Sequence, residues 1–317
     1  MKTCIHRLIR NIIISTNLDV LISKMGVLSP KIVSWLDGGL GSQMWQFALG
    51  YCISQKTGLP LYLKTDFFTN NGCDIKGNPN RKFLLFDAFP AIGDQFSDKI
   101  ITTSDKLFLW LFSDHSCQRN SFYDYNPEVL FSGHSIFVTQ YYANAKYLEG
   151  YREELRKLFQ FNLQLNMEEQ ILLRFISEHN TCAVHIRKGD FVGSVHEVCT
   201  DAYYLEAMKQ MTNMHKDTHF VIFSNDEAYS KQLISLGNIT NATILEGRSE
   251  EDPRIDMYLM TKCKNFIISN SGFSWFPAFL AEDNATVMLP EYWTNNTKSR
   301  EISREAFKLN NWILVHV

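Results

Sequence analysis

The chain has 317 residues, of which 45% are hydrophobic and 21% are charged, so a disordered or low-complexity protein is excluded. This length favours two domains over one. With 31 Lys and Arg against 34 Asp and Glu, the net charge of −3 argues against a protein that binds nucleic acid through bulk positive charge.

The first 24 residues are expected to be an N-terminal extension. The most apolar stretch, residues 11–28, contains Asn11, Asp19 and Lys24, and a membrane span needs about 20 mostly apolar residues. It also lacks the cleavage site of a signal peptide. Met25 is therefore an alternative start, and residues 1–24, if translated, would form a weak amphipathic surface anchor.

Residues 25–165 are expected to form the first domain, an α/β domain. A strand at 31–36 leads through the glycine turn Asp37–Gly41 into a helix, which Ser42 is expected to cap and Gly58 to end. A second strand follows at 59–64. Strand, glycine loop, helix and strand in this order predict the start of a parallel sheet.

Periodicity weakens over residues 66–135, which we expect to be irregular. A strand at 136–139 and a helix at 144–159 complete the first domain.

Residues 166–317 alternate regularly between strand and helix patterns. The expected strands are 181–186, 220–224, 242–246, 265–269 and 286–289, and the expected helices are 201–214 capped by Thr200, 226–235, 253–263 capped near Ser249, and 273–280. This alternation predicts a doubly wound, Rossmann-like domain. Two such domains are expected to face one another across a cleft.

Three segments that could carry chemistry each follow a predicted strand, where open α/β sheets bind ligands. The first is Gly38–Gln43. A glycine turn entering a helix brings backbone N–H groups close to an anion. A plain strand-to-helix turn would give the same pattern.

The second segment is His185–Asp190. Alternation along the strand places His185 and Arg187 on one face. Arg187 and Lys188 can neutralise a diphosphate, and Asp190 can accept a proton or orient the arginine. The alternative is a surface salt-bridge cluster.

The third segment, Ser269–Phe276, enters a helix, and its hydroxyl and N–H groups suit phosphate oxygens. An ordinary helix cap with core aromatic residues is the alternative.

Ser224–Asp226 ends another strand and could contact a base or sugar. Asp256 lies within a predicted helix, where an aspartate is usually solvated or capping.

The sequence has no Asp-x-Asp triplet and no His or Cys pair at the spacing of metal ligands. Its seven cysteines contain no Cys-x-x-Cys pair and are typical of reduced thiols. No metal or other cofactor is therefore expected, and a bound diphosphate would be neutralised by Arg, Lys and helix termini.

Taken together, the segments resemble the motifs of the α-1,2-fucosyltransferases of glycosyltransferase family 11. The family loop Gly-Gly-Leu-Gly-Asn-Gln-Met corresponds to Gly38–Met44, and His-x-Arg-Arg-Gly-Asp-Tyr to His185–Phe191. The family motif Asn-Ser-x-Phe-Ser-Trp-Trp corresponds to Asn270–Phe276. The resemblance spans residues 31–293. Ser42 replaces the family Asn, and Lys188 replaces the second Arg and loses its bidentate geometry.

The resemblance implies a two-domain GT-B fold and metal-independent, inverting transfer of L-fucose from GDP-fucose to the 2-hydroxyl of a terminal β-galactoside. It also implies a bacterial, cytoplasmic protein, with peripheral membrane contact as an option, that builds O-antigen or capsule on a galactose-terminated or lipid-linked glycan. Residues 66–135 are expected to shape acceptor specificity.

The expected catalytic residues are Arg187, Asp190, His185 and Lys188, with His196 and Glu197 as alternative bases. The expected donor-binding residues are Gly39, Gly41, Ser42, Gln43, Ser224, Asn225, Asp226, Asp256, Asn270, Ser271, Gly272, Phe273 and Ser274. Two alternatives stay open. One is a GT-B transferase with another sugar or acceptor, and the other is a catalytically inactive nucleotide-sugar-binding protein.

Overall fold

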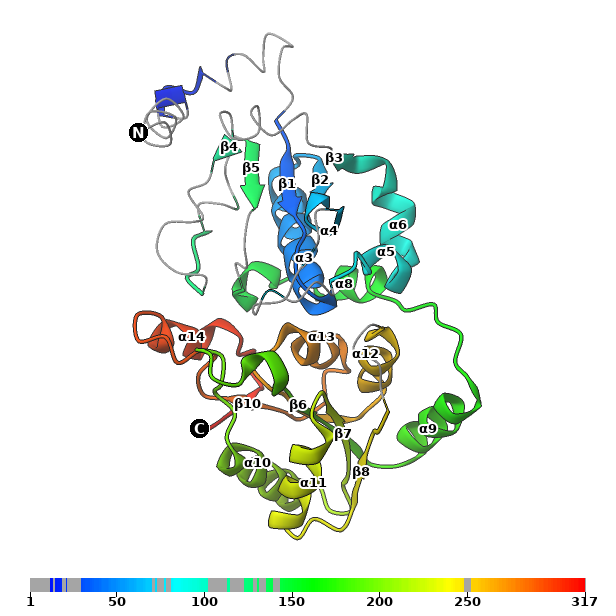
Figure 1. The fold of residues 1–317 in the computed structure, drawn as a ribbon. Helices are drawn as coiled ribbons and strands as arrows, with labels where there is room; N and C mark the ends of the chain where they lie inside the picture. The colour runs from blue at the N-terminus through cyan, green and yellow to red at the C-terminus, as the bar shows by residue number, and fades with distance from the viewer. Residues whose placement is uncertain are drawn as a thin grey trace. The chain divides into compact units, whose positions relative to one another are not determined.

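A computed structural model describes residues 12–13, 15–18, 21, 30–69, 72, 77, 81–101, 113–114, 123–127, 130, 135–138, 143–247 and 252–316 (Figure 1). The chain forms two compact units. Unit 1 comprises Met1–Cys73 and Pro79–Leu158, and unit 2 comprises Asp74–Asn78 and Phe159–Val317. The division after Leu158 lies a few residues before the domain boundary expected at residue 165.

Unit 1 contains a parallel sheet with the strand order β3-β2-β1-β5-β4. Its strands are β1 (Ile32–Trp35), β2 (Leu61–Lys64), β3 (Ile100–Ile101), β4 (Ser113–Asp114) and β5 (Ser135–Val138). Its helices are α3 (Leu40–Thr57), α4 (Asp66–Thr69), α5 (Leu85–Ala88), α6 (Pro90–Phe96) and α8 (Arg152–Leu158), with the 3-10 helices η1 (Ser97–Lys99) and η5 (Ala145–Leu148).

Helix α3 packs against this sheet closely enough to require a glycine. A Cβ atom on Gly50 would collide with Ser34 Oγ of β1 and lie 2.9 Å from Leu61 Cδ1 of β2. Gly58 ends α3 in the left-handed conformation, with φ of 70°, as expected from the sequence. The expected cap was wrong, because α3 already begins at Leu40 with Gly39 as its N-cap, so Ser42 lies inside the first turn.

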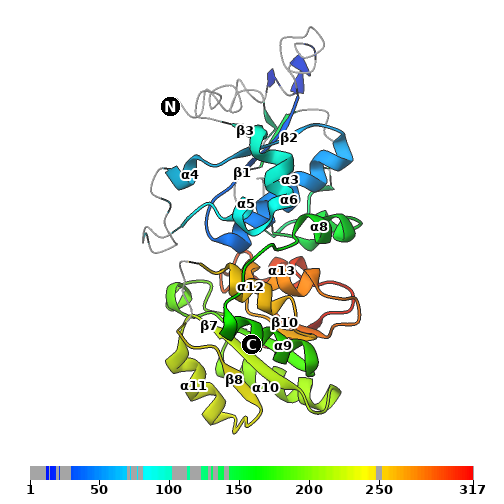
Figure 2. The same ribbon diagram turned by 90° about the vertical axis from the view of Figure 1, so that its right-hand side faces the viewer.

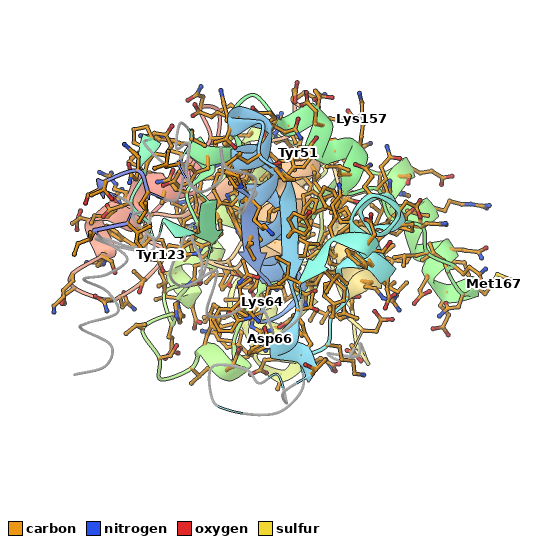
Figure 3. The ribbon with its side chains drawn as sticks, turned by 90° about the horizontal axis from the view of Figure 1, so that it is seen from above. Tyr51, Lys64, Asp66, Tyr123, Lys157 and Met167 are labelled. Atoms are coloured by element: carbon orange, nitrogen blue, oxygen red, sulfur yellow. The ribbon has the colours of Figure 1, made fainter. Side chains whose placement is uncertain are left out.

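The carboxyl end of β2 carries a buried ion pair. Lys64, the last residue of β2, is 3% exposed and pairs with Asp66, the first residue of α4 (Figure 3). On the neighbouring strand β1, Trp35 pairs with Lys64 in register. The Lys64–Asp66 ion pair therefore lies at the same edge of the sheet as the glycine loop, which follows β1.

The weakly patterned part of unit 1 differs from the sequence expectation. Residues 66–135 include the short helices α4, α5 and α6 as well as β3 and β4, where irregular structure was expected. The single helix expected at 144–159 is two shorter elements, η5 and α8. Gly150 separates them with a φ of +83°, which a right-handed helix cannot contain.

Unit 2 contains a parallel sheet with the order β11-β10-β9-β6-β7-β8. Its strands are β6 (Thr181–Ile186), β7 (His219–Ser224), β8 (Ala242–Ile244), β9 (Asn265–Ile267), β10 (Val287–Pro290) and β11 (Ile313–Val315). Its helices are α9 (Met167–Glu178), η6 (Gly189–Phe191), α10 (Asp201–Met214), α11 (Glu227–Leu236), α12 (Arg254–Met260), α13 (Gly272–Leu280) and α14 (Arg300–Ala306).

Helices cover both faces of the unit 2 sheet, α10 and α11 on one face and α12 and α13 on the other (Figures 1 and 2). Residues 182, 184 and 186 of β6 pack with Tyr204 and Met208 of α10 in one buried apolar cluster. His185 points to the opposite face, toward α13. This alternation confirms the doubly wound α/β fold expected for the second domain.

Helix caps in unit 2 follow the sequence in part. Thr200 caps α10, as expected, by accepting a hydrogen bond from Tyr203 N. Helix α12 has Pro253 at its N-cap without a side-chain bond, and Ser249, the expected cap, lies outside the described residues. Within the described ranges, none of the helices has the length and hydropathy needed to cross a membrane.

Candidate functional site

Three of the predicted segments meet at one edge of the unit 2 sheet. Strand β6 lies between β7 and β9, and all three run parallel. Their carboxyl ends lead into His185–Asp190, Ser224–Asp226 and Ser269–Ser274, respectively. The fold thus brings these segments together as the sequence predicts, at the edge where α/β sheets bind ligands.

Arg187 and Asp190 form the charged centre of this edge. Arg187 Nη2 lies 2.5 Å from Asp190 Oδ1, with the arginine side chain 19% exposed and the aspartate side chain 9% exposed. The guanidinium also lies 5.5 Å from the ring centre of Phe191. A partly exposed arginine held on one side by a carboxylate is oriented in advance for an anion.

The turn between these two residues depends on glycine. Gly189 has a φ of +48°, and a Cβ atom there would run into the side-chain amide of Asn225. Asn225 Oδ1 in turn accepts the backbone N–H of Lys188 at 2.9 Å. Asn225 therefore fixes the loop that carries Arg187 and Asp190.

Lys188 does not join Arg187 in the way expected from the sequence. Its Nζ atom donates to the carbonyl oxygen of Cys199 at 3.3 Å and lies 4.2 Å from the ring centre of Tyr229. Tyr229 donates its hydroxyl hydrogen bond to Asp201 at 2.5 Å. The ammonium group thus connects the loop after β6 to the segment before α10 and to α11, and its expected role as a catalytic cation stays a prediction.

His185 is buried in β6, two residues before Arg187, and is neutral. Its Nδ1 atom is 2.9 Å from Ser274 Oγ and 2.8 Å from Ser269 Oγ. Burial, with the nearby charge of Arg187 as a second cause, lowers the pKa of His185 to about 3. The imidazole is therefore uncharged at neutral pH.

The turn after β9 starts α13. Ser271 is the N-cap of α13, and its hydroxyl oxygen accepts a hydrogen bond from Phe273 N at 3.3 Å. The first turn of α13 contains no acidic residue. Ser271, Gly272 and Phe273 are half-buried, so the positive end of the helix dipole lies at the partly exposed edge of the sheet.

Asn270 has a structural role instead of a free amide for a ligand. It is 4% exposed, and its Nδ2 donates to the carbonyl oxygens of His196 at 2.9 Å and Trp293 at 3.0 Å. The loops that follow β6 and β10 are thereby tied to the turn after β9. Both N–H groups of the Asn270 amide are therefore used within the protein, and its expected contact with the donor stays a prediction.

The loop at 191–199 holds the two alternative bases. The Glu197 carboxylate accepts the backbone N–H of Gly193 at 2.8 Å, which closes the loop locally. The ring of His196 lies 5.3 Å from that of Phe191. Burial lowers the pKa of His196, and the negative charge of Asp190 opposes this shift. His196 is thus the alternative that lies close to the charged pair.

The remaining expected residues of unit 2 have mixed roles. Asp226 caps α11 by accepting Tyr229 N at 2.9 Å, and Ser224 Oγ bonds the backbone of Asp226 at 3.0 Å. Both side chains therefore support the turn after β7. Asp256 lies half-buried in the first turn of α12.

The glycine loop of unit 1 exposes a helix start. Gly39 is the N-cap of α3, with no side-chain hydrogen bond, and the first turn of α3 has no acidic residue. The guanidinium of Arg81 passes 3.4 Å from the position of a Cβ atom on Gly39. Gly41 and Ser42 lie in the first helical turn. A helix start beside an arginine favours an anion.

Gln43, expected to bind the donor, is fully buried and fully bonded within unit 1. Its Nε2 donates to the carbonyl oxygens of Gly38 at 3.2 Å and Lys82 at 2.8 Å. Its Oε1 accepts the N–H groups of Leu84 at 3.0 Å and Leu85 at 3.2 Å. All four hydrogen-bonding positions of the amide are used, so Gln43 anchors residues 82–85, and its expected contact with the donor stays a prediction.

Two residues beside the site, Asn295 and Trp293, were missed by the sequence analysis. Asn295 donates to the carbonyl oxygens of Val195 and Glu197, each at 2.7 Å, and Trp293 accepts from Asn270. No local pattern marks either residue, because the contact of Asn295 with Glu197 spans 98 positions and that of Trp293 with Asn270 spans 23. In the part of the chain that the structure describes, no group of three or more His, Cys, Asp or Glu residues is arranged to hold a metal ion.

Each of the two units is built on a parallel sheet with helices, which is the α/β class expected from the sequence. The profile of glycosyl transferase family 11 matches residues 118–316, and the chain belongs to this family. The resemblance identified from the three motifs is thereby confirmed.

Two Escherichia coli relatives match most of the chain. An alpha-1,2-colitosyltransferase is 28% identical over 278 residues, covering 83% of this chain and 92% of that protein. The O-antigen biosynthesis glycosyltransferase WbnK is 28% identical over 312 residues, covering 88% of this chain and 99% of that protein. The mouse galactoside alpha-(1,2)-fucosyltransferase 1 is 28% identical over 176 residues, which are 51% of this chain and 46% of that protein.

The fucosyltransferase NodZ and POFUT1 are among the solved structures that match the chain. NodZ from Bradyrhizobium has a TM-score of 0.43 and 18% identity, covering 80% of this chain and 94% of that chain. POFUT1 in complex with GDP-fucose has a TM-score of 0.43 and 12% identity, covering 82% of this chain and 97% of that chain.

Proposed function

We propose that this glycosyltransferase moves L-fucose from GDP-fucose to the 2-hydroxyl of a terminal β-galactoside, with inversion at the anomeric carbon. The observation that carries the proposal is the Arg187–Asp190 pair, which lies at the sheet edge where the turn into α13 also lies. The sequence similarity to galactoside α-1,2-fucosyltransferases supports the donor and the linkage. The similarity to WbnK supports a role in surface glycans such as O-antigen or capsule.

In the proposed reaction, the anomeric C–O bond to GDP breaks while the acceptor oxygen attacks from the opposite face. Negative charge then grows on the β-phosphate. Arg187, oriented by Asp190, would stabilise this charge together with the N–H groups at Ser271–Ser274 of the α13 start. Removing one such oriented contact typically costs about 3–4 kcal/mol, or roughly 100–1000-fold in rate.

Among the three candidate bases, we propose His196 as the group that accepts the proton of the acceptor hydroxyl. Asp190 is engaged with Arg187, and Glu197 with the backbone of Gly193. His196 has a lowered pKa and is therefore largely unprotonated at neutral pH, with a lone pair available. The charge of Asp190 would stabilise the imidazolium that forms.

This chemistry needs no metal ion in the proposal, because an arginine and a helix terminus supply the positive charge. The proposed partners are GDP-fucose and a galactose-terminated oligosaccharide or lipid-linked glycan. The expectation of a cytoplasmic protein stays a prediction.

A second candidate is transfer of colitose instead of fucose. It is favoured by the E. coli alpha-1,2-colitosyltransferase, which aligns with 83% of this chain. Both candidates share the α-1,2 linkage and differ only in the donor sugar, so one experiment separates them.

The test is to incubate the purified protein with a β-galactoside and either GDP-fucose or GDP-colitose, and to determine the product linkage by NMR. The proposal expects an α-linked fucose on O2 of galactose. If an α-1,2-linked product forms from GDP-colitose and none forms from GDP-fucose, the donor sugar is colitose and the fucose proposal is wrong. GDP binding without a product from either donor, over a panel of galactosides, would point to an inactive nucleotide-sugar-binding protein.

A further inference from the structure

One histidine at the candidate site is held by three different elements. His185 belongs to β6, Ser269 follows β9, and Ser274 lies in the first turn of α13. The two serine hydroxyls lie within 2.9 Å of the same ring nitrogen, Nδ1. From the opposite face of the sheet, the hydroxyl of Tyr204 in α10 donates to the carbonyl oxygen of His185 at 3.2 Å.

The hydrogen bonds favour a ring that is unprotonated at Nδ1. With a lone pair there, Ser269 donates to Nδ1, and Ser274 donates either to Nδ1 or to the carbonyl oxygen of Ser271 at 3.4 Å. With a proton on Nδ1, the Ser269 hydroxyl would have no acceptor among the described residues. A buried hydroxyl without an acceptor is costly, so the proton resides on Nε2.

This contact links the catalytic arginine to the helix start. Arg187 follows His185 by two residues, just after the end of β6. Ser274 lies one helical turn after Ser271, the N-cap of α13. All three side chains that meet at Nδ1 are at most 5% exposed. A shift of this contact would therefore displace the N–H groups of α13 relative to Arg187.

We propose that His185 is a positioning residue whose Nδ1 atom, held by Ser269 and Ser274, fixes the first turn of α13 relative to Arg187. It takes no part in proton transfer, contrary to its expected place among the catalytic residues. Its low pKa is consistent with this role, because a ring that stays neutral keeps the same hydrogen bonds across the working pH range. The inference rests on the proposed function for its effect on rate, but the contact itself can be tested without it.

Two substitutions separate positioning from direct contact with the substrate. In His185→Asn, the amide carbon is Cγ, so Oδ1 or Nδ2 falls near the place of Nδ1. In His185→Gln, the amide reaches the place of Nε2 instead. Asn is the smaller residue and leaves the larger cavity, so a role based on bulk alone would make His185→Asn the worse variant. The proposal predicts the reverse order.

We expect His185→Gln and the double variant Ser269→Ala/Ser274→Ala to lower kcat about 30- to 100-fold, because small displacements of oriented groups have effects of this size. His185→Asn should retain kcat within about 5-fold, with the pH profile of kcat unchanged in shape. The matched control is His215→Ala. The Nε2 atom of this histidine also lies at hydrogen-bond distance from a hydroxyl, Thr286 Oγ1 at 2.7 Å. That contact lies just before the start of β10, at the opposite edge of the sheet.

Hydrogen exchange of the amides at 272–274 provides a readout that does not depend on turnover. Protection should fall in His185→Gln and in the double variant, and it should be kept in His185→Asn and His215→Ala. Equal loss of kcat in both His185 variants, with protection kept in both, would overturn the proposal and point to direct action through Nε2. Loss of a pH-dependent limb in His185→Asn would also overturn it. Failure of wild-type GDP binding would instead refute the proposed function, while the exchange result would still decide the positioning role.

Discussion

Two neighbouring cations at the end of β6 have different surroundings, and this difference decides what each can do. Arg187 is held by a carboxylate and remains partly exposed. Lys188 has its ammonium group between a carbonyl oxygen and the ring of Tyr229. The ammonium group of Lys188 is thus engaged within the protein, whereas the guanidinium of Arg187 keeps an exposed side.

The first prediction compares Arg187→Met with Lys188→Met. Loss of Arg187 should lower kcat about 100- to 1000-fold, with little change in thermal stability. Loss of Lys188 should lower kcat less than about 10-fold and destabilise the protein by about 1 kcal/mol, through the lost cation–π contact and hydrogen bond. Steady-state kinetics and thermal unfolding check both values. Equal losses of kcat would show that Lys188 acts on the donor.

At this scale, the sequence predicts which residues gather but not which of their atoms are already used. Strand alternation is enough to place His185 and Arg187 at one edge. It does not reveal that the amides of Gln43 and Asn270 are used by backbone groups 39 and 74 positions away, respectively. Such long-range bonds depend on the folded path of several loops, which no local pattern records.

At the scale of elements, the packing of α3 on its sheet depends on one position. Gly50 has no side chain where Ser34 and Leu61 approach the helix. Alanine is intrinsically the better helix former, by about 1 kcal/mol. The effect of Gly50→Ala on stability therefore depends on whether the gain in helix propensity exceeds the cost of the collision with Ser34 and Leu61.

We predict that Gly50→Ala lowers the free energy of unfolding by about 1–2 kcal/mol, because overpacking a tight interface typically costs about 1–3 kcal/mol and outweighs the gain in propensity. Denaturant unfolding measures the change. Gln55→Ala, on the exposed side of the same helix, is the control and should stay within about 0.5 kcal/mol of wild type. A stabilised Gly50→Ala protein would contradict the close approach.

Element prediction from the sequence succeeds where apolar periodicity and punctuation agree. The strands and helices of unit 2 from β6 to β10 follow the predicted alternation. Helix α9 was missed despite its capping box, in which Asn166 and Glu169 bond each other's backbone N–H groups. The expected helix at 144–159 failed because Gly150 adopts a left-handed conformation inside an otherwise helical pattern.

At the scale of the whole molecule, two parallel sheets of different strand order share one chain. The family match covers residues 118–316, which include nearly all of unit 2. Residues 66–135, expected to set acceptor choice, are described only in part, and that expectation stays a prediction. Acceptor specificity escapes sequence reasoning because it depends on loop shape more than on residue type.

The most direct test of the proposed function is GDP release from GDP-fucose in the presence of EDTA, with and without a β-galactoside, for wild type and Arg187→Ala. We predict release that requires the galactoside, persists in EDTA, and falls about 100- to 1000-fold in the variant, as expected for loss of one oriented charge at the leaving diphosphate. Release that stops in EDTA, or that is equal in wild type and Arg187→Ala, would contradict the account.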